Sequence, residues 1–120
     1  MYLKEIVEKI NGKVLNGEDK LESMVVESAA ASDLMSEVLA FAEPGMLLIT
    51  GLVSPQVIRT AVVVGIPAIL VVRHENVPEE LVSLAKSNDL VLITTPLSMF
   101  ETCGRLYMEG LKPAKRGRFS

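Results

Sequence analysis

The stretch Pro-Ala-Ile-Leu-Val-Val at residues 67–72 lies between two similar runs, Met-Leu-Leu-Ile-Thr at 46–50 and Leu-Val-Leu-Ile-Thr at 90–94. Short runs that stay apolar instead of alternating are typical of strands buried on both faces, as in a parallel sheet. The intervening stretches, 55–64 and 78–87, are long enough to be the crossover helices that parallel strands require. Because such crossovers are right-handed, this unit predicts an α/β fold, a three-layer sandwich with a mainly parallel sheet and helices on both faces.

Toward the N-terminus, the pattern predicts one helix and two strands ahead of this unit. A helix at residues 3–10 is indicated by an apolar stripe with i, i+3, i+4 and i+7 spacing. The residues of that stripe are Leu3, Ile6, Val7 and Ile10. Weaker patterns predict a small strand at 13–15, a loop at 18–23 and a longer strand at 24–31.

Two further helices complete the prediction. Ser32 or Asp33 is suited to cap a second helix, because short polar side chains accept hydrogen bonds from the free amides of a first turn. The apolar residues of that helix, which we expect to face the core, are Leu34, Val38 and Phe41. A last helix is expected from Pro96 to about Gly110, and Thr95 precedes it as a cap.

The composition favours one packed domain. The chain has 120 residues, of which 49% are hydrophobic and 22% charged, a balance that supports a core without disulfides or a structural metal. Residues 1–111 are expected to form this domain and residues 112–120 a basic flexible tail. The single cysteine, Cys103, excludes an intramolecular disulfide, and His74 is the single histidine. We therefore expect no metal and no cofactor.

Charge and hydropathy exclude two classes of partner. Residues 1–111 hold 8 basic and 15 acidic residues, a net charge of −7 that repels phosphate backbones, so we expect no nucleic-acid partner. The basic residues of the tail are Lys112, Lys115, Arg116 and Arg118. The longest apolar run, at 61–72, is interrupted by Gly65 and Pro67 and is shorter than the roughly 18 residues that cross a bilayer, so we expect no membrane partner.

The polar N-terminus does not resemble a signal peptide, which predicts a cytoplasmic protein.

A candidate ligand site follows from the predicted sheet. In open parallel sheets, ligands bind beyond the carboxyl ends of the strands, where loops lead into helix N-termini with free amides. Hydroxyls, a glycine for close backbone approach and an arginine follow the three buried strands, which suits an anionic or nucleotide-like ligand. The candidate ligand-binding residues are Thr50, Gly51, Ser54, Arg73, Thr94, Thr95 and Ser98. Capping by Ser54 and Thr95 and the strand propensity of Thr50 explain the same residues without a ligand.

The sequence contains none of the common catalytic motifs. It has no GxxxxGK[ST] phosphate loop and no GxGxxG, and Ser54 does not lie in a GxSxG elbow. His74 falls in a predicted loop with nothing to identify it as a base. Cys103 falls in the apolar period of the last helix, which is typical of a small buried residue. We therefore assign no catalytic residue and do not expect an enzyme.

Four short segments carry a resemblance to a known family. They are Ile-Val-Glu-Lys-Ile-Asn-Gly-Lys-Val-Leu at 6–15, Ala-Ser-Asp-Leu-Met-Ser at 31–36, Leu-Ile-Thr-Gly at 48–51 and Ile-Thr-Thr-Pro-Leu-Ser-Met-Phe at 93–100. Together, over Leu3 to about Leu111, they resemble the DRTGG domain, although Asp-Arg-Thr-Gly-Gly itself does not occur. That family includes free-standing short proteins and modules of some phosphotransacetylases and CBS-domain pyrophosphatases, and the N-terminal domain of HPr kinase is similar.

The resemblance implies a non-catalytic regulatory or dimerising α/β module, and it assigns neither a ligand nor an activity. The residues that it places in the loop region of the family are Thr50, Gly51, Thr94, Thr95 and Pro96. From the resemblance and the strand ends together, we expect a module that senses a small anionic or nucleotide-like metabolite and relays the signal to a protein partner. The first alternative is an assembly or protein-interaction module without a ligand, and the second is a small enzyme.

A homodimer is also expected, from one helix of the predicted sandwich. The run Ala-Val-Val-Val at residues 61–64 gives this helix apolar residues on every side, more than one face of a sheet can bury. A second apolar surface needs a second partner, and a second copy of the chain would supply one.

Overall fold

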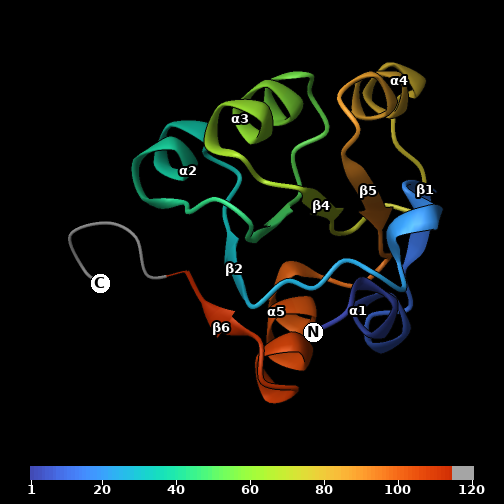
Figure 1. The fold of residues 1–120 in the computed structure, drawn as a ribbon, viewed down its shortest axis with the longest axis vertical. Coiled ribbons are helices and arrows are strands. Elements are labelled where there is room, and N and C mark those ends of the chain that lie inside the picture. The colour runs from blue at the N-terminus through green and yellow to red at the C-terminus, as the bar shows by residue number, and fades with distance from the viewer. Residues whose placement is uncertain (115–120) are drawn as a thin grey trace.

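The computed structural model describes residues 1–114, which form a six-stranded sheet between two layers of helices (Figure 1). The strands are β1 (Lys13–Asn16), β2 (Ser28–Ala31), β3 (Leu47–Thr50), β4 (Ala68–Val71), β5 (Val91–Thr94) and β6 (Lys112–Pro113). The α-helices are α1 (Leu3–Lys9), α2 (Met35–Phe41), α3 (Gln56–Val64), α4 (Glu79–Ser87) and α5 (Met99–Met108), and a short 3-10 helix, η1, spans Glu18–Lys20. The predicted three-layer sandwich is confirmed.

The sheet is mainly parallel, as the sequence predicted. Its strand order is β1-β5-β4-β3-β2-β6, and of these pairings that of β1 with β5 is antiparallel while the others are parallel. The last residues of the three central strands are in register, because Thr50 pairs with Val71 and Val71 pairs with Thr94. The loops that follow β3, β4 and β5 therefore leave the sheet from one line.

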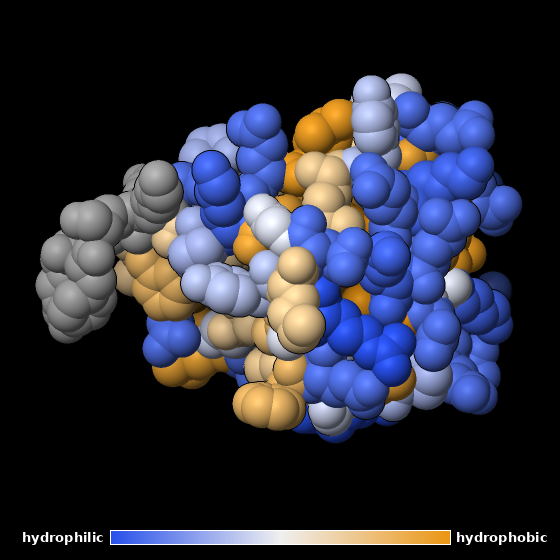
Figure 2. Space-filling view, turned by 90° about the horizontal axis from the view of Figure 1, so that it is seen from below, coloured by the Kyte–Doolittle hydropathy of each residue, from blue (hydrophilic) through white to orange (hydrophobic). Residues whose placement is uncertain are grey.

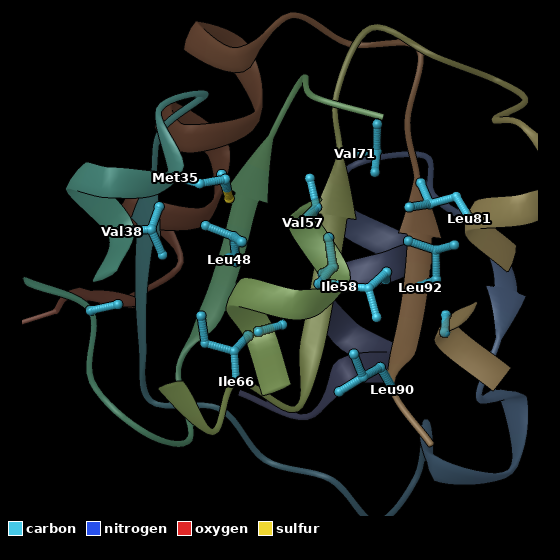
Figure 3. Packing of buried hydrophobic residues seen from close by; sticks show 14 of the residues in the cluster. Met35, Val38, Leu48, Val57, Ile58, Ile66, Val71, Leu81, Leu90 and Leu92 are labelled. Carbon is cyan, nitrogen blue, oxygen red and sulfur yellow. The ribbon is translucent and has the colours of Figure 1, made fainter. Parts of the chain in front are cut away.

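Alternating residues of the central strands pack against the two helical layers. Helices α2, α3 and α4 cover one face, and α1 and α5 cover the other (Figure 1). Leu48 and Leu92 point toward the α2–α4 layer (Figure 3), whereas Leu47 and Ile93 belong to the cluster under α1 and α5. Both faces are buried, which explains why these strands are apolar throughout.

The second helix begins later than expected, and of its three expected core residues Val38 alone is fully buried. Neither Ser32 nor Asp33 caps it; the Ser32 hydroxyl accepts a hydrogen bond from the amide of Leu34 (3.0 Å), which forms a turn ahead of the helix. This turn delays the helix and rotates its apolar face. The core residues on this helix and its C-terminal cap are Met35, Val38 and Ala42. The expected core residue Leu34 is instead 60% exposed, and Phe41 is half-buried.

The last helix begins at Met99 and not at Pro96, and its cap is Ser98, whose hydroxyl accepts from the Glu101 amide (3.1 Å). Thr95 is not the cap, because its hydroxyl accepts from the amide of Leu97 within the preceding loop (3.2 Å).

Two expectations nearer the N-terminus are also corrected. The strand expected at 24–31 is confined to 28–31, since Val25 forms an isolated bridge with Tyr2 outside the sheet. The loop expected at 18–23 contains η1.

The C-terminal edge of the sheet extends beyond Leu111, the residue at which the domain was expected to end. Strand β6 pairs with β2: the Lys112 amide donates to the Glu27 carbonyl (3.2 Å) and the Ala114 amide to the Ala29 carbonyl (3.0 Å). The rest of the expected tail, residues 115–120, lies outside the described residues.

Candidate functional site

The carboxyl ends of β2 and β3 bring an aspartate and a threonine together. The Asp33 carboxylate, which follows β2, accepts through Oδ1 from the backbone amide of Gly51 (2.6 Å) and from the Thr50 hydroxyl (3.1 Å). Thr50 is fully buried, and its Oγ1 also accepts from the Leu52 amide (3.1 Å). These bonds tie the start of the loop after β3 to the loop after β2.

Arg73 completes this arrangement from the end of β4. Its backbone is in the left-handed region, with φ of 63°, and its amide donates to the Leu97 carbonyl (2.9 Å). Its guanidinium Nη2 lies 3.5 Å from Asp33 Oδ2, and both side chains are 51% exposed. The guanidinium rests directly over Gly51, where a Cβ would collide with Nη2. Glycine is therefore needed here for close approach, not for its φ. We call Asp33, Thr50, Gly51 and Arg73 the rim cluster.

Electrostatics keep the rim cluster charged. The hydrogen bond from the Gly51 amide is the main cause that lowers the pKa of the Asp33 carboxyl, with smaller contributions in the same direction from the Thr50 hydroxyl and the Arg73 charge. Partial burial of Asp33 opposes them. Asp33 is thus an anion at neutral pH, and it holds Arg73 by charge.

The loop after β3 also offers backbone donors. The Ser54 hydroxyl accepts from the Gln56 amide (3.3 Å), and the Ser54 carbonyl accepts from the Val57 amide (3.1 Å), so Ser54 closes the first turn of α3. No acceptor among residues 1–114 pairs with the amides of Val53 and Ser54 themselves. Two amides next to the rim cluster are therefore free to donate to a ligand.

At the end of β5, the candidate hydroxyls are turned into the protein. Thr94 and Thr95 are both fully buried. The Thr94 hydroxyl donates to the Glu75 carbonyl (3.2 Å), and the Thr95 hydroxyl donates to the Ile10 carbonyl (2.6 Å). These bonds fasten the loops after β4 and α1 to the sheet, so neither hydroxyl proton remains available to a ligand.

A polar hollow of about 220 Å³ lies beside Thr94. Its lining residues are Asn11, Lys13, Glu75, Asn76, Thr94 and Pro96. The Lys13 ammonium donates to the Asn76 side-chain oxygen across it (3.3 Å). Lys13 is thus the second basic side chain at this edge of the sheet, next to β5.

The structure therefore divides the predicted site residues into two groups. In the first group, Thr50, Gly51 and Arg73 lie together, and Ser54 follows in the loop after β3. In the second group, Thr94, Thr95 and Ser98 lie at or after the end of β5, where their hydroxyls form hydrogen bonds within the protein. Sequence reasoning missed Asp33 as a member of the site and treated it as a helix cap. The signal was its place directly after a strand, but only the pairing of β2 with β3 shows that it reaches Gly51.

The single cysteine of the sequence, Cys103, lies outside the rim cluster. Burial raises the pKa of the Cys103 thiol, which favours the unreactive protonated form. Cys103 lines a small apolar pocket of about 120 Å³ between β2 and α5. Within residues 1–114, no three His, Cys, Asp or Glu side chains are grouped so as to hold a metal ion. No helix of that range is long and apolar enough to cross a membrane.

The fold and the rim cluster define a small α/β module with a polar edge at its strand ends. The sequence model of the DRTGG domain matches residues 5–108, and the chain belongs to this family. Its fold is similar to that of the CBS and DRTGG domains of the regulatory region of Clostridium perfringens pyrophosphatase, crystallised with the activator diadenosine tetraphosphate. The TM-score is 0.75 at 15% sequence identity, over 99% of this chain and 52% of that one. The chain thus spans about half of that structure, and no curated protein matches the sequence.

Proposed function

We propose that this chain is a non-catalytic regulatory module that senses a small anionic or nucleotide-like metabolite at the ends of β3 and β4. The observation that carries the proposal is the half-exposed guanidinium of Arg73 over Gly51, beside a loop with two free amides. Guanidinium groups and free backbone amides are well suited to bind phosphate and carboxylate oxygens. Membership of the DRTGG family, and a fold similar to a regulatory region crystallised with a nucleotide activator, support the proposal.

Each residue of the site has a distinct role in this proposal. Arg73 binds the anion, because the guanidinium has five N–H donors and Asp33 engages it through Nη2. Asp33 holds the guanidinium in position, and Gly51 leaves space for it. The Ser54 hydroxyl accepts one bond in the structure and keeps its proton for the ligand. Buried Thr50, Thr94 and Thr95 shape the loops, and Ser98 fixes the start of α5.

One observation favours the alternative of an assembly module without a ligand. The two charges of the rim cluster already neutralise each other, and the buried threonine hydroxyls already have partners. Charges and hydroxyls that are already paired within the protein do not require a ligand. Under this alternative, the exposed apolar surfaces of the helices carry the function through contacts with a protein.

We also propose that the module works as a homodimer. The support from residues 61–64 is narrower than the sequence suggested, because Ala61 is fully buried and Val64 is half-buried. Val62 and Val63 are 51% and 75% exposed and remain as an apolar surface on α3.

A thermal-shift screen against nucleotides and phosphorylated metabolites tests the ligand proposal. A ligand at 100 times its dissociation constant should stabilise the protein by about 2.7 kcal/mol. Arg73→Ala should abolish the shift, whereas Arg59→Ala, which removes an exposed arginine on α3 outside the rim cluster, should retain it. The absence of a shift with every compound, or an equal shift with Arg73→Ala, would favour the assembly module.

A further inference from the structure

The outward side of α5 carries three strongly exposed large hydrophobic side chains, with the charged residue Glu101 beside them. Phe100, Tyr107 and Met108 are 90%, 70% and 86% exposed, and with Gly104 they occupy positions i, i+4, i+7 and i+8 of one helical face. This face, which we call the α5 outer face, lies opposite the buried Thr102 and Leu106. A helix that is apolar on both sides is normally covered on both sides.

The surface next to the α5 outer face, over α1, is hydrophilic. Figure 2 views the molecule from the side of α1 and α5, where hydrophobic surface gathers toward α5 and hydrophilic surface covers the half over α1. Single exposed apolar side chains are common, but a contiguous group without charged members marks a contact surface. By comparison, the exposed valines on α3 share their groove with Arg59 and Asn88.

We propose that the α5 outer face binds a second copy of this chain, with the two α5 helices antiparallel about a two-fold axis at Gly104. Phe100 and Met108 each lie four residues from Gly104, so the axis sets Phe100 of one copy against Met108 of the other, twice. Aromatic rings and thioethers pack favourably. A two-fold interface requires such self-complementarity, in which residue i meets residue j and residue j meets residue i.

Backbone geometry and charge both permit this contact. A Cβ on Gly104 would meet nothing within 4 Å, so the glycine leaves the backbone between Phe100 and Met108 uncovered, and the partner helix can approach it closely. Beside the face, Glu101 and Arg105 form an ion pair (2.7 Å). The flank therefore carries no net charge, and two copies of a chain with a net charge of −3 can meet here without local repulsion.

The area of the face predicts a weak dimer. Side chains of this size contribute about 150 Å² each, so the three exposed residues supply roughly 400–450 Å² per copy. A standard stable interface buries about 800 Å² per partner. We therefore expect association in the micromolar range, visible as a dependence of mass on concentration. This inference rests on the proposed homodimer and assigns its interface to α5 in place of the exposed valines on α3.

Sedimentation equilibrium of the full chain, from about 1 to about 500 μM, tests the proposal together with the variant Gly104→Gln. The glutamine side chain would cover the exposed backbone at this position, keep the partner helix at a distance and weaken dimerisation by at least about tenfold. In dilute monomer its melting temperature should rise, because glycine is unfavourable inside a helix and the new side chain meets no neighbour. A simple folding defect would lower the melting temperature instead.

The variant Val63→Gln on α3 separates the two exposed apolar surfaces, since Val63 belongs to the α3 surface and is also exposed and helical. It should dimerise as the wild type does. If Val63→Gln dissociates the dimer and Gly104→Gln does not, the α5 assignment is overturned while the homodimer stands. A wild-type chain that stays monomeric throughout overturns both, and the ligand proposal is judged separately by Arg73→Ala.

Discussion

The strands β3 and β5 end in nearly the same sequence, Leu-Leu-Ile-Thr and Val-Leu-Ile-Thr, but their loops have opposite properties. After β3, a half-exposed ion pair lies over Gly51 and two amides stay free. After β5, buried hydroxyls are bonded to the Ile10 and Glu75 carbonyls. The neighbouring strands cause this difference. Strand β3 lies beside β2, and the loop after β2 supplies Asp33. Strand β5 lies beside β1, and the segment before β1 supplies Ile10. An open edge and a sealed edge thus arise from one local motif.

The sealed edge should be the more costly to disturb. We expect Thr95→Val to lower the free energy of unfolding by about 2–3 kcal/mol, because it leaves the Ile10 carbonyl and the Leu97 amide without their partner. Thr50→Val should cost about 1 kcal/mol, since water can reach half-exposed Asp33 in its place. Urea denaturation of both variants measures the difference. Equal losses would show that the two edges are equally closed.

A buried threonine without a partner should behave in the opposite way. The Thr102 hydroxyl on α5 is buried and has no hydrogen-bond partner among the described residues. Thr102→Val keeps the shape and removes the unsatisfied group, so we expect the protein to gain about 1 kcal/mol. The same urea experiment measures the gain. A loss of stability would mean that this hydroxyl is hydrogen-bonded, as that of Thr95 is.

At the open edge, Asp33→Asn should lower stability by about 1 kcal/mol at neutral pH through the weakened bond from the Gly51 amide. The folded pKa of Asp33 is below its unfolded value, so its charge stabilises the protein above the unfolded pKa of about 4. That contribution is lost as pH falls through the folded pKa. The difference between wild type and Asp33→Asn should therefore shrink below about pH 4 in acid titrations of stability. A difference independent of pH would contradict the role of the charge.

The smallest effect on stability is expected from Gly51→Ala. Gly51 does not have a positive φ, and the added Cβ would collide with the flexible end of Arg73, which can move away. Stability should change by less than about 0.5 kcal/mol. The Asp33 pKa, followed by carboxyl-carbon NMR, should rise relative to wild type because the guanidinium has left. An unchanged pKa would mean that Arg73 does not hold Asp33 in solution.

The ends of the helices show where sequence reasoning failed. Ser32, Asp33 and Thr95 are all good capping residues: Ser32 or Asp33 was expected to cap the second helix, and Thr95 the last one. In the structure, the Ser32 and Thr95 hydroxyls form turns one step earlier, and Asp33 bonds to a different loop. Short polar side chains bind whichever amide is nearest, and that choice depends on the path of the neighbouring chain.

The sequence alone determined the layers of this protein, because continuous burial of strands and the spacing of helices are local consequences of hydropathy. It also determined that the carboxyl ends of these strands form one polar edge, with Arg73 and Gly51 on it. The tertiary structure decided which part of that edge is open, since the order of the strands sets Asp33 beside Gly51 and Ile10 beside Thr95. Strand order depends on contacts between residues far apart in the chain, such as the Thr95–Ile10 bond across 85 positions, and no local pattern encodes them.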